Sequence, residues 1–289
     1  MLLARHQTEF AAPDYDLAAT LDSGQAFRWI RVGESWESVI SGRWVTLRQE
    51  GETLHAGSNR SPGDWEWLRA YLRCNEDLGP IVDSFPADEA FVRALDACRG
   101  LRLLRQEPWE CLASFICSSS KQIVQIRQIV SAMCARYGSV VGPADAVIHH
   151  SFPAPEVLAA TSESELRECK MGYRAPYVLG SARMVAAGEI KLSGLGGLSC
   201  EEARKELMRL PGVGRKVADC VLLFAFGFQE AFPIDVWIDR GLRELYFPRR
   251  KPTRQRLANF TKSYFGPYAG YAQQYLFHYV RAIRTRENQ

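Results

Sequence analysis

Hydrophobic and polar residues alternate along three short segments near the start of the chain. These segments are residues 27–32, 36–40 and 43–47. Glycine-containing turns follow them, at residues 33–34, 41–42 and 50–51. Alternation with a period of two is typical of strands that bury one face. The segments are therefore predicted to form an antiparallel meander, and apolar residues at helical spacing predict a helix over 64–72.

From about residue 89 onward the apolar residues recur with a helical period instead. Helices are predicted at residues 111–116, 123–137, 163–170, 177–187, 201–210, 215–226 and 268–284, with another beginning at residue 235. Pro80 and Pro86 interrupt the pattern, so a domain boundary is predicted within residues 78–88. The predicted fold class is α+β, with an N-terminal antiparallel β-sheet domain over residues 1–88 and a larger all-helical domain over residues 89–289.

The overall composition is that of a globular protein. Of the 289 residues, 47% are hydrophobic and 24% are charged. No apolar run approaches the length that spans a bilayer. The first residues lack a basic stretch followed by an apolar core, so no secretory signal is expected. We therefore expect an intracellular protein.

Charge is unevenly distributed along the chain, although the net charge is only +3. Residues 1–88 hold 8 Lys and Arg against 14 Asp and Glu, whereas residues 89–289 hold 28 against 19. From Arg240 to the end the count is 11 against 2. A chain divided in this way is expected to present its second part to a polyanion. A solvated basic tail is the alternative that charge alone leaves open.

The segment Leu210–Cys220, with the sequence LPGVGRKVADC, carries the most specific chemical signal. Its Pro-Gly pair is typical of a tight turn, and Gly214 lets the backbone approach a ligand closely. The amides of such a turn, beside the positive end of the following helix, form a seat for a phosphate. Lys216 opens that helix, and Asp235, nineteen residues further on, is placed to cap another. A helical hairpin that binds phosphate without chemistry is the alternative.

The order of hairpin, lysine and aspartate resembles the helix-hairpin-helix glycosylase superfamily (HhH-GPD), which removes damaged bases from DNA. Further motifs resemble one branch of it, the 8-oxoguanine DNA glycosylases. They follow one order across nearly the whole chain, at residues 23–29 (SGQAFRW), 101–119 (LRLLRQEPWECLASFICSS), 172–175 (GYRA) and 266–273 (GPYAGYAQ). The resemblance implies an N-terminal domain like the TATA-box-binding protein, excision of 8-oxoguanine from double-stranded DNA with strand cleavage, and no required cofactor.

The resemblance assigns two residues to the chemistry. Lys216 would be the nucleophile that forms a Schiff base with the sugar, and Asp235 would stabilise the positive charge that develops there. Attack requires a neutral amine, and an unperturbed lysine is only about 0.1% neutral near pH 7.4. Burial and a helix N-terminus both disfavour the ammonium form, which suits the position of Lys216. A phosphate-binding surface lysine and a purely capping aspartate are the alternatives.

Four residues are expected to hold the base after it leaves the duplex. By resemblance, Cys220 and Phe277 would lie on its two faces, and Gln273 would hydrogen-bond its Watson–Crick edge. The carbonyl of Gly24 would accept a hydrogen bond from N7–H, a proton that guanine lacks. One such bond can discriminate strongly when its absence leaves a buried polar group unpaired. Taken singly, Phe277 is typical of a core and Gly24 of a turn.

The resemblance also assigns contacts to the DNA around the base. Tyr173 would wedge into the gap in the base stack, with Arg174 beside the unpaired partner base. Backbone amides would hold phosphate near Gly212, Gly214, Lys216 and Val217. Backbone carbonyls would bind a structural monovalent or divalent cation at Met208, Leu210 and Val213.

The segment after the serines at 118–119 departs from the family pattern. Ser120 stands where the family has an asparagine that fills the vacated space, and Gln125 where it has an arginine that reads the opposing cytosine. Glutamine offers a single amide instead of a forked donor. We therefore expect a weaker preference for cytosine opposite the lesion. Trp237 replaces a phosphate-touching histidine, and its indole N–H can still donate one bond.

The eight cysteines show no Cys-x-x-Cys pair and no spacing typical of a metal site. The related endonuclease III branch has an iron–sulfur cluster on C-terminal cysteines, and no cysteine follows Cys220 here, so no such cluster is expected. The leading hypothesis is a bifunctional 8-oxoguanine DNA glycosylase and lyase that acts on DNA as a monomer, without a membrane. A relative with another lesion or opposite base and a non-catalytic DNA-binding protein are the alternatives.

Overall fold

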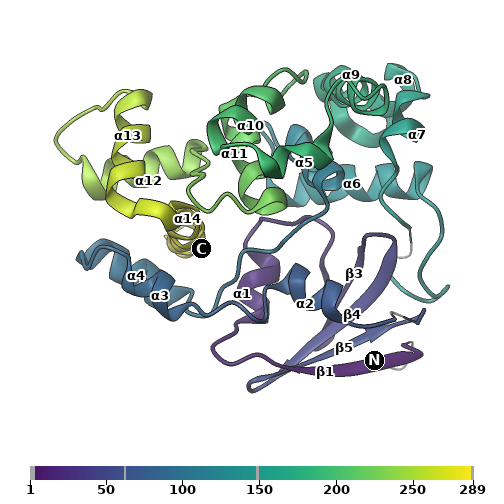
Figure 1. Cartoon of the computed structure of the whole chain (residues 1–289), viewed down its shortest axis with the longest axis horizontal. Helices are drawn as coiled ribbons and strands as arrows, with labels where there is room; N and C mark the ends of the chain where they lie inside the picture. The colour runs from purple at the N-terminus through teal and green to yellow at the C-terminus, as the bar shows by residue number, and fades with distance from the viewer. Residues whose placement is uncertain (1–3, 62, 148–149, 288–289) are drawn as a thin grey trace.

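The computed structural model describes residues 4–61, 63–147 and 150–287, with side chains described as far as residue 281. Its first part is a five-stranded antiparallel sheet in the order β1-β5-β4-β3-β2 (Figure 1). The strands are β1 (His6–Ala11), β2 (Ile30–Val32), β3 (Ser35–Ile40), β4 (Arg43–Glu50) and β5 (Thr53–Ser58). Successive strands from β2 to β5 are neighbours, which confirms the predicted meander.

Two features of the sheet differ from the sequence-based expectation. Strands β1 and β5 were not predicted, and they pair with each other at the far edge of the meander. The strand expected from residue 27 begins only at Ile30. Phe27 leaves the sheet because its ring packs in the helical domain, edge-on to Phe115 with the centroids 5.2 Å apart. The strand predicted over residues 27–32 therefore began three residues too early.

One face of the sheet carries a small hydrophobic core. Helices α1 (Leu17–Asp22) and α2 (Glu66–Leu72) lie against this face (Figure 1). The strand side chains that point toward them include Phe10, Leu47 and Leu54, which are at most 1% exposed. Their alternate positions along the strands explain the period of two in the sequence.

The remaining elements of the described chain are helical. The α-helices are α3 (Gly79–Asp83), α4 (Glu89–Ala97), α5 (Pro108–Cys117), α6 (Ile123–Tyr137), α7 (Pro155–Ala159), α8 (Glu163–Leu166), α9 (Ala175–Ala186), α10 (Cys200–Leu207), α11 (Arg215–Val221), α12 (Val236–Tyr246), α13 (Arg254–Phe265) and α14 (Ala269–Glu287). Shorter 3-10 or π turns are η1 (Arg167–Met171), η2 (Gly172–Arg174), η3 (Leu192–Gly197), η4 (Leu222–Phe226) and η5 (Gly266–Tyr268). Sheet followed by helices is the predicted α+β class.

Every helix predicted from the sequence has a counterpart, but several helices were missed. The predicted helices at 163–170 and 215–226 end in the π turns η1 and η4 rather than continuing as α-helix. The short helices α1, α3 and α7 span too few turns to show a period. Helix α13 is different, because Leu257, Phe260 and Tyr264 have helical spacing and would have allowed its prediction.

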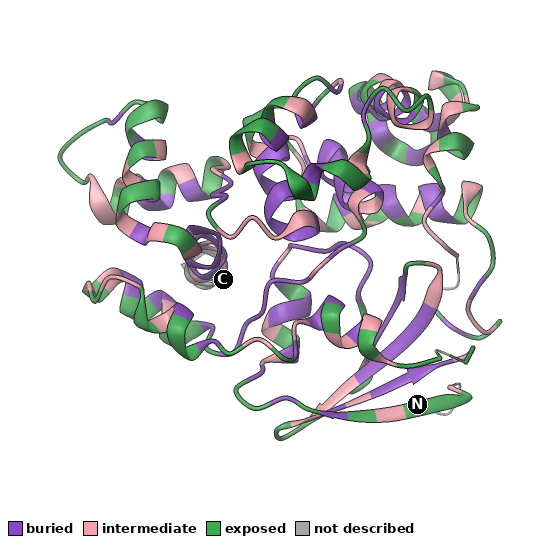
Figure 2. Ribbon diagram, viewed as in Figure 1, coloured by how far each residue is buried: buried purple, intermediate pink, exposed green. Residues whose placement is uncertain are grey.

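The larger hydrophobic core lies among the helices and reaches back to α3 and α4. Figure 2 shows buried residues on the faces that the helices turn toward one another. Phe91 of α4 contacts Phe265 of α13, with ring centroids 5.3 Å apart. Leu78 already belongs to this core, whereas Leu104, further along the chain, still belongs to the smaller one. The boundary within residues 78–88 therefore stays a prediction.

The second face of the sheet is covered by the loop that follows α6. Val39 and Trp44 of the sheet cluster with Val141 and Ala146 of this loop. Asn59, at the end of β5, donates from Nδ2 to the Val141 carbonyl at 2.7 Å. A loop of the helical part therefore holds the sheet in place on the side opposite α1 and α2.

A buried ion pair joins the two helices of the hairpin. Arg204 on α10 donates from Nε to Asp219 Oδ1 on α11 at 2.6 Å, and the two side chains are 9% and 4% exposed. Burial raises the pKa of the Asp219 carboxyl, and the neighbouring Arg204 guanidinium opposes that rise. The pair therefore fixes α10 against α11, and with them the turn that precedes Lys216.

Replacing Arg204 by methionine is expected to destabilise the protein strongly. The substitution would leave the buried Asp219 carboxyl with only the longer contact to Nε of Arg215, at 3.8 Å. Loss of one partner of a buried pair costs about 3 kcal/mol in comparable cases, which corresponds to a fall in Tm of roughly 6–12 °C. Thermal unfolding of Arg204→Met would be compared with Arg209→Met, which removes an ion pair to Glu206 whose side chains are 52% and 40% exposed. Equal Tm values for the two variants would contradict the structural role of the buried pair.

Candidate active site

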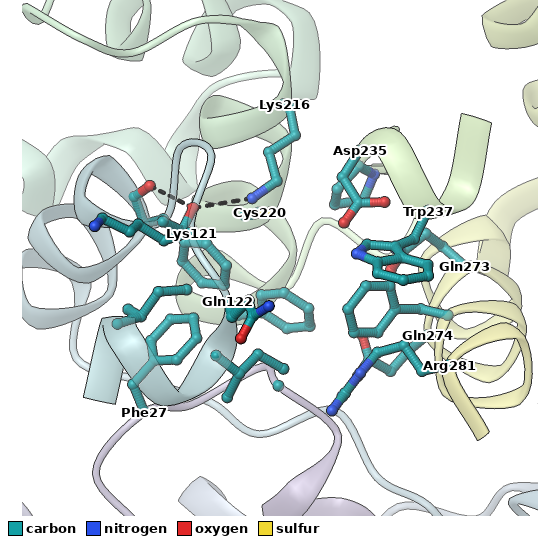
Figure 3. Close-up of a pocket in the computed structure, with 18 of the residues that line it drawn as sticks. Phe27, Lys121, Gln122, Lys216, Cys220, Asp235, Trp237, Gln273, Gln274 and Arg281 are labelled. Atoms are coloured by element: carbon teal, nitrogen blue, oxygen red, sulfur yellow. Dashed lines mark hydrogen bonds between the residues drawn. The ribbon is translucent and has the colours of Figure 1, made fainter. Parts of the chain in front are cut away.

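A pocket of about 370 Å³ opens between the hairpin helix α11 and the helices α12 and α14. Its floor comes from α5 and α6 and from the turn after α1 (Figure 3). Seven residues singled out in the sequence line this pocket together: Gly24, Lys216, Cys220, Asp235, Trp237, Gln273 and Phe277. The tertiary structure therefore brings the two residues assigned to the chemistry and the four assigned to the base into one space.

Lys216 reaches the pocket from the first turn of α11, two residues after the N-cap Gly214. Its Nζ donates to the hydroxyl of Ser118 at 3.1 Å and lies 5.1 Å from the centroid of the Phe115 ring (Figure 3). The Ser118 hydroxyl in turn donates to the carbonyl of Phe115 at 2.7 Å. Ser118 therefore presents a lone pair to the amine and holds it at the pocket wall. The sequence analysis did not predict this contact, although Ser118 lies inside the motif at residues 101–119.

Asp235 is the N-cap of α12, as the sequence predicts. Its Oδ1 accepts a hydrogen bond from the amide of Ile238 at 2.8 Å, and its side chain projects into the same pocket as Lys216 (Figure 3). Burial raises the pKa of this carboxyl above the ordinary value of an aspartate. The Ile238 amide, Lys216 and the Trp237 amide oppose that rise. The amide at the start of α12 thus fixes the orientation of the carboxyl. Because its pKa is raised, the carboxyl takes up a proton at a higher pH than an exposed aspartate does.

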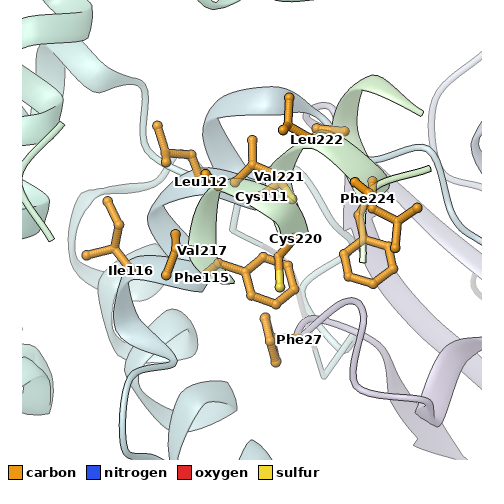
Figure 4. Close-up of a cluster of buried hydrophobic side chains, with 14 of the residues drawn as sticks. Phe27, Cys111, Leu112, Phe115, Ile116, Val217, Cys220, Val221, Leu222 and Phe224 are labelled. Atoms are coloured by element: carbon orange, nitrogen blue, oxygen red, sulfur yellow. The ribbon is translucent and has the colours of Figure 1, made fainter. Parts of the chain in front are cut away.

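An apolar wall faces the space beside the lysine. Cys220 is 3% exposed and lies near the rings of Phe27, Phe115 and Phe224 (Figure 4). Burial raises the pKa of the Cys220 thiol to about 12, so the thiol stays neutral near pH 7. Phe277 of α14 is half-buried, lines the pocket and lies under the Arg281 guanidinium, 5.3 Å from its carbon. These surfaces suit a flat, uncharged ring.

Two polar groups of the pocket are shaped for hydrogen bonding to a ligand. Gln273 is 4% exposed, and its Oε1 is buried without a hydrogen-bond partner among the described residues. Gly24 has φ = +81°, and a Cβ added there would lie only 2.6 Å from Cδ1 of Ile123. Only glycine fits this turn without strain. A buried unpaired amide oxygen is costly unless a ligand donates to it.

Three of the residues expected to offer amides to a phosphate, Gly212, Gly214 and Val217, do not line the pocket. Gly212, with φ = +76°, and Gly214 are exposed at the turn, whereas Val217 is buried in the first turn of α11. Among the residues expected to offer carbonyls to a cation, Met208 is exposed and Leu210 and Val213 are buried. The Leu210 carbonyl accepts from the Val213 amide at 3.2 Å. The turn thus has the shape expected of it, and its ligands remain a prediction.

The wedge candidates lie on the turn before α9. Tyr173 is 51% exposed, as a side chain that enters a base stack would be. Arg174 is only 3% exposed. Its Nε donates to the carbonyl of Ser119 at 2.8 Å, and its guanidinium carbon lies 4.1 Å from the centroid of the Tyr173 ring. Arg174 therefore braces Tyr173 and the segment at Ser119, and contact with a partner base would require it to leave these partners.

The segment after Ser119 contributes residues that the sequence analysis did not assign. Ser120 is exposed with φ = +53°, and Gln125 is exposed at the start of α6, where its Oε1 accepts from the amide of Gln122 at 3.1 Å. Neither lines the pocket, whereas Lys121 and Gln122 do. Their position just after the motif at residues 101–119 could have indicated that they lie near the pocket. Gln274 and Arg281 on α14 also line the pocket and were not predicted.

The described residues offer neither a cluster of metal ligands nor a membrane-spanning helix. No group of three or more His, Cys, Asp or Glu side chains in that part of the chain is arranged to hold a metal ion. No helix formed by the described residues combines the length and the apolar character needed to cross a membrane.

Two family models match the chain over consecutive stretches. Residues 8–112 match the N-terminal domain of 8-oxoguanine DNA glycosylases, and residues 113–267 match the HhH-GPD superfamily of base excision DNA repair proteins. The chain therefore belongs to the HhH-GPD superfamily, the class that its hairpin, lysine and aspartate define. Within that superfamily the match of residues 8–112 places it in the 8-oxoguanine DNA glycosylase family.

Individual relatives are similar to this chain along most of its length. An N-glycosylase/DNA lyase of Saccharomyces cerevisiae is 32% identical, over 90% of this chain and 82% of the relative. A probable N-glycosylase/DNA lyase of Methanothermobacter thermautotrophicus is 34% identical, over 93% and 94%. The structure of MBOgg1 in complex with a low-affinity DNA ligand superposes with a TM-score of 0.91 at 34% identity, covering 96% of each chain.

A second solved structure has a similar fold over nearly its whole length. The Clostridium acetobutylicum 8-oxoguanine glycosylase/lyase, in complex with double-stranded DNA containing cytosine opposite 8-oxoguanine, has a TM-score of 0.89 at 28% identity. The match covers 98% of this chain and 99% of that one. The predicted family and the predicted fold are thereby confirmed.

Protonation of Asp235 is expected to limit base excision on the acid side. Because burial raises its pKa, the rate should begin to fall at a higher pH than an exposed aspartate would give. Asp235→Asn should lower the single-turnover rate by roughly 100-fold or more and should change the acid limb, because the asparagine amide does not take up a proton in this pH range. The pH dependence of single-turnover excision by both proteins measures the effect. An unchanged acid limb in Asp235→Asn would assign the titration to another group.

Proposed function

We propose that this protein excises 8-oxoguanine from double-stranded DNA and then cleaves the strand at the resulting site. The observation that carries the proposal is the pocket itself. An amine and a carboxyl, from Lys216 and Asp235, project into one space beside the unpaired Oε1 of Gln273. A protein that only binds DNA has no need of this combination. Membership in the 8-oxoguanine DNA glycosylase family supports the substrate.

The excision step uses the lysine as nucleophile. The neutral amine of Lys216 attacks C1′ of the extruded nucleotide, and the C1′–N9 bond breaks as the base leaves with its electron pair. The carboxylate of Asp235 stabilises the positive charge that the sugar carries during this displacement. The hydrogen bond from Nζ to Ser118 leaves the amine lone pair available for attack once the amine is neutral.

Strand cleavage follows from the same covalent adduct. The adduct nitrogen first loses one proton. Its lone pair then forms the C1′=N bond of a protonated imine while the C1′–O4′ bond breaks, and O4′ takes up a proton. The imine acidifies C2′–H, so loss of that proton pushes out the 3′ phosphate with cleavage of the C3′–O3′ bond. Water then hydrolyses the imine and returns Lys216. No metal or cofactor is assigned a part in these steps.

The lesion would be recognised by the polar groups of the pocket. The Oε1 of Gln273 is an acceptor, and the Watson–Crick edge of 8-oxoguanine offers the N1–H and N2–H donors. The Gly24 carbonyl would accept from N7–H, and Cys220 and Phe277 would enclose the ring. Guanine presents a lone pair at N7 instead of a proton, so it would place two acceptors against each other.

The surrounding DNA would be held by the hairpin and the wedge. Amides near Gly212, Gly214 and Val217 would take a phosphate, and Trp237 at the pocket mouth would supply one indole N–H. Tyr173 would fill the gap in the stack with Arg174 behind it. A cation on the carbonyls of Met208, Leu210 and Val213 remains part of the proposal, as do an intracellular location and a monomeric state.

Borohydride trapping is expected to reveal the Schiff base and its nucleophile together. Wild-type protein with a duplex containing 8-oxoguanine opposite cytosine should form a covalent protein–DNA band, and Lys216→Gln should not, because glutamine cannot form an imine. Lys262→Gln, at an exposed lysine of α13, is the control and should trap as well as wild type. Binding without trapping by the wild type would favour the alternative of another lesion or of a non-catalytic DNA-binding protein.

Opposite-base preference is expected to be weak. Ser120 and Gln125 lack the forked cationic donor that reads cytosine. Excision rates opposite C, A, G and T should therefore lie within about fivefold, or about 1 kcal/mol, at the low end of the roughly 1–3 kcal/mol that a good bidentate contact supplies. Gln125→Arg should raise the preference for cytosine. Single-turnover excision rates on the four duplexes measure this preference. A strict preference for cytosine in the wild type would contradict the prediction.

A further inference from the structure

The turn that carries Gly24 is surrounded by three buried glutamines from separate parts of the chain. Gln25 follows the turn, Gln106 lies in the extended segment before α5, and Gln274 lies on α14, next to Gln273. Their exposures are 0%, 9% and 2%. Buried amides are costly unless their donors and acceptors are paired. The partners of these side chains therefore show what the glutamines hold.

Two of the glutamines anchor the peptide groups on either side of Gly24. Gln274 donates from Nε2 to the carbonyl of Ser23 at 3.0 Å. Gln106 donates from Nε2 to the carbonyl of Gln25 at 2.6 Å. The Gly24 carbonyl belongs to the peptide group between these two. Since each peptide group is planar, anchoring both neighbours fixes the two Cα atoms that flank the Gly24 carbonyl, and the carbonyl can then turn only about the axis between them.

The third glutamine ties the same turn to the segment between the two cores. Gln25 donates from Nε2 to the carbonyl of Thr20 at 2.9 Å and to that of Arg102 at 2.8 Å. Its Oε1 accepts from the amide of Leu104 at 2.8 Å. Both ends of this side-chain amide are therefore used, and the turn cannot shift without breaking buried hydrogen bonds.

Gly24 itself is held tightly but keeps a free acceptor. A Cβ at this position would approach Cδ1 of Ile123 to 2.6 Å and Cε1 of Phe277 to 3.3 Å, so the turn lies against the pocket wall. Gly24 lines the pocket. No other described residue donates a hydrogen bond to its carbonyl. The anchored turn therefore presents one acceptor whose direction is set by its neighbours.

We propose that Gln274 and Gln106 are positioning residues that aim the Gly24 carbonyl at the base and thereby set the discrimination between 8-oxoguanine and guanine. This inference rests on the proposed function, because N7–H is the feature that the carbonyl would read. Hydrogen bonds weaken steeply when donor and acceptor are misaligned. Loss of either anchor should therefore weaken the preference for the lesion more than it weakens the lysine chemistry.

The test compares Gln274→Met and Gln106→Met, which keep the size of the side chain and remove its donor. The first readout is binding in the Lys216→Gln background, to duplexes with 8-oxoguanine or guanine opposite cytosine. The preference for 8-oxoguanine should fall about tenfold in both variants, the effect expected of one hydrogen bond. The second readout, with Lys216 intact, is single-turnover excision of 8-oxoguanine against cleavage at an abasic site, which has no base to read. Excision should be lowered about tenfold more than abasic-site cleavage.

Gln49→Met is the matched control. The Gln49 amide also holds backbone at the start of α1, since its Nε2 donates to the Tyr15 carbonyl at 2.6 Å and its Oε1 accepts from the Leu17 amide at 2.8 Å. It does not touch the Gly24 turn, so the control should keep the full preference for 8-oxoguanine. Thermal unfolding of all three variants shows whether they fold. If one of the two anchors is needed for folding, the other variant decides.

Two results would overturn the inference. One is a preference for 8-oxoguanine in both anchor variants equal to that of Gln49→Met, and the other is an equal loss of excision and of abasic-site cleavage. Failure of the proposed function looks different, because then the wild-type protein itself would neither prefer nor excise 8-oxoguanine. A wild type that is active, with variants that lose only the preference, would establish the positioning role.

Discussion

The pocket depends on an extended segment, residues 101–107, that is hydrogen-bonded to both halves of the molecule. The amide of Arg105 donates to the carbonyl of Tyr71 in α2, and the amide of Gln106 donates to the carbonyl of Phe224 after α11, both at 2.8 Å. Gly24 comes from the first half, while Lys216 comes from the second. Their separation is therefore set by this segment, and a shift between the two halves would move the acceptor away from the nucleophile.

Helix ends supply the electrostatics of the site. Lys216 lies in the first turn of α11 and Asp235 caps the first turn of α12, so two positive helix ends face the pocket. The amides at the start of α12 favour the carboxylate form of Asp235, the form that stabilises positive charge on the sugar. Burial acts against the carboxylate and raises its pKa. Burial and the backbone amides of α12 therefore act in opposite directions on the pKa of Asp235.

Much of the site could be predicted from the sequence because its residues lie in short motifs. The turn before α11 is specified by its glycines, and Asp235 caps α12 through a contact only three residues away. The partners that were missed act across long separations. Ser118 and Lys216 lie 98 positions apart, and Gln274 and Ser23 lie 251 apart. No local period reports such contacts, and the short helices around them are formed by packing rather than by propensity.

The sequence by itself determined the class of fold, the order of the motifs and the chemical groups available, since these follow from local spacing and from side-chain chemistry. Only the tertiary structure decided which groups meet. It joined Gly24 to α14 and α5 to α11, placed Lys121 and Gln122 in the pocket instead of Ser120 and Gln125, and buried Arg174 behind Tyr173. The physical reason is that a pocket is made of contacts between distant segments, and those contacts depend on how the helices pack.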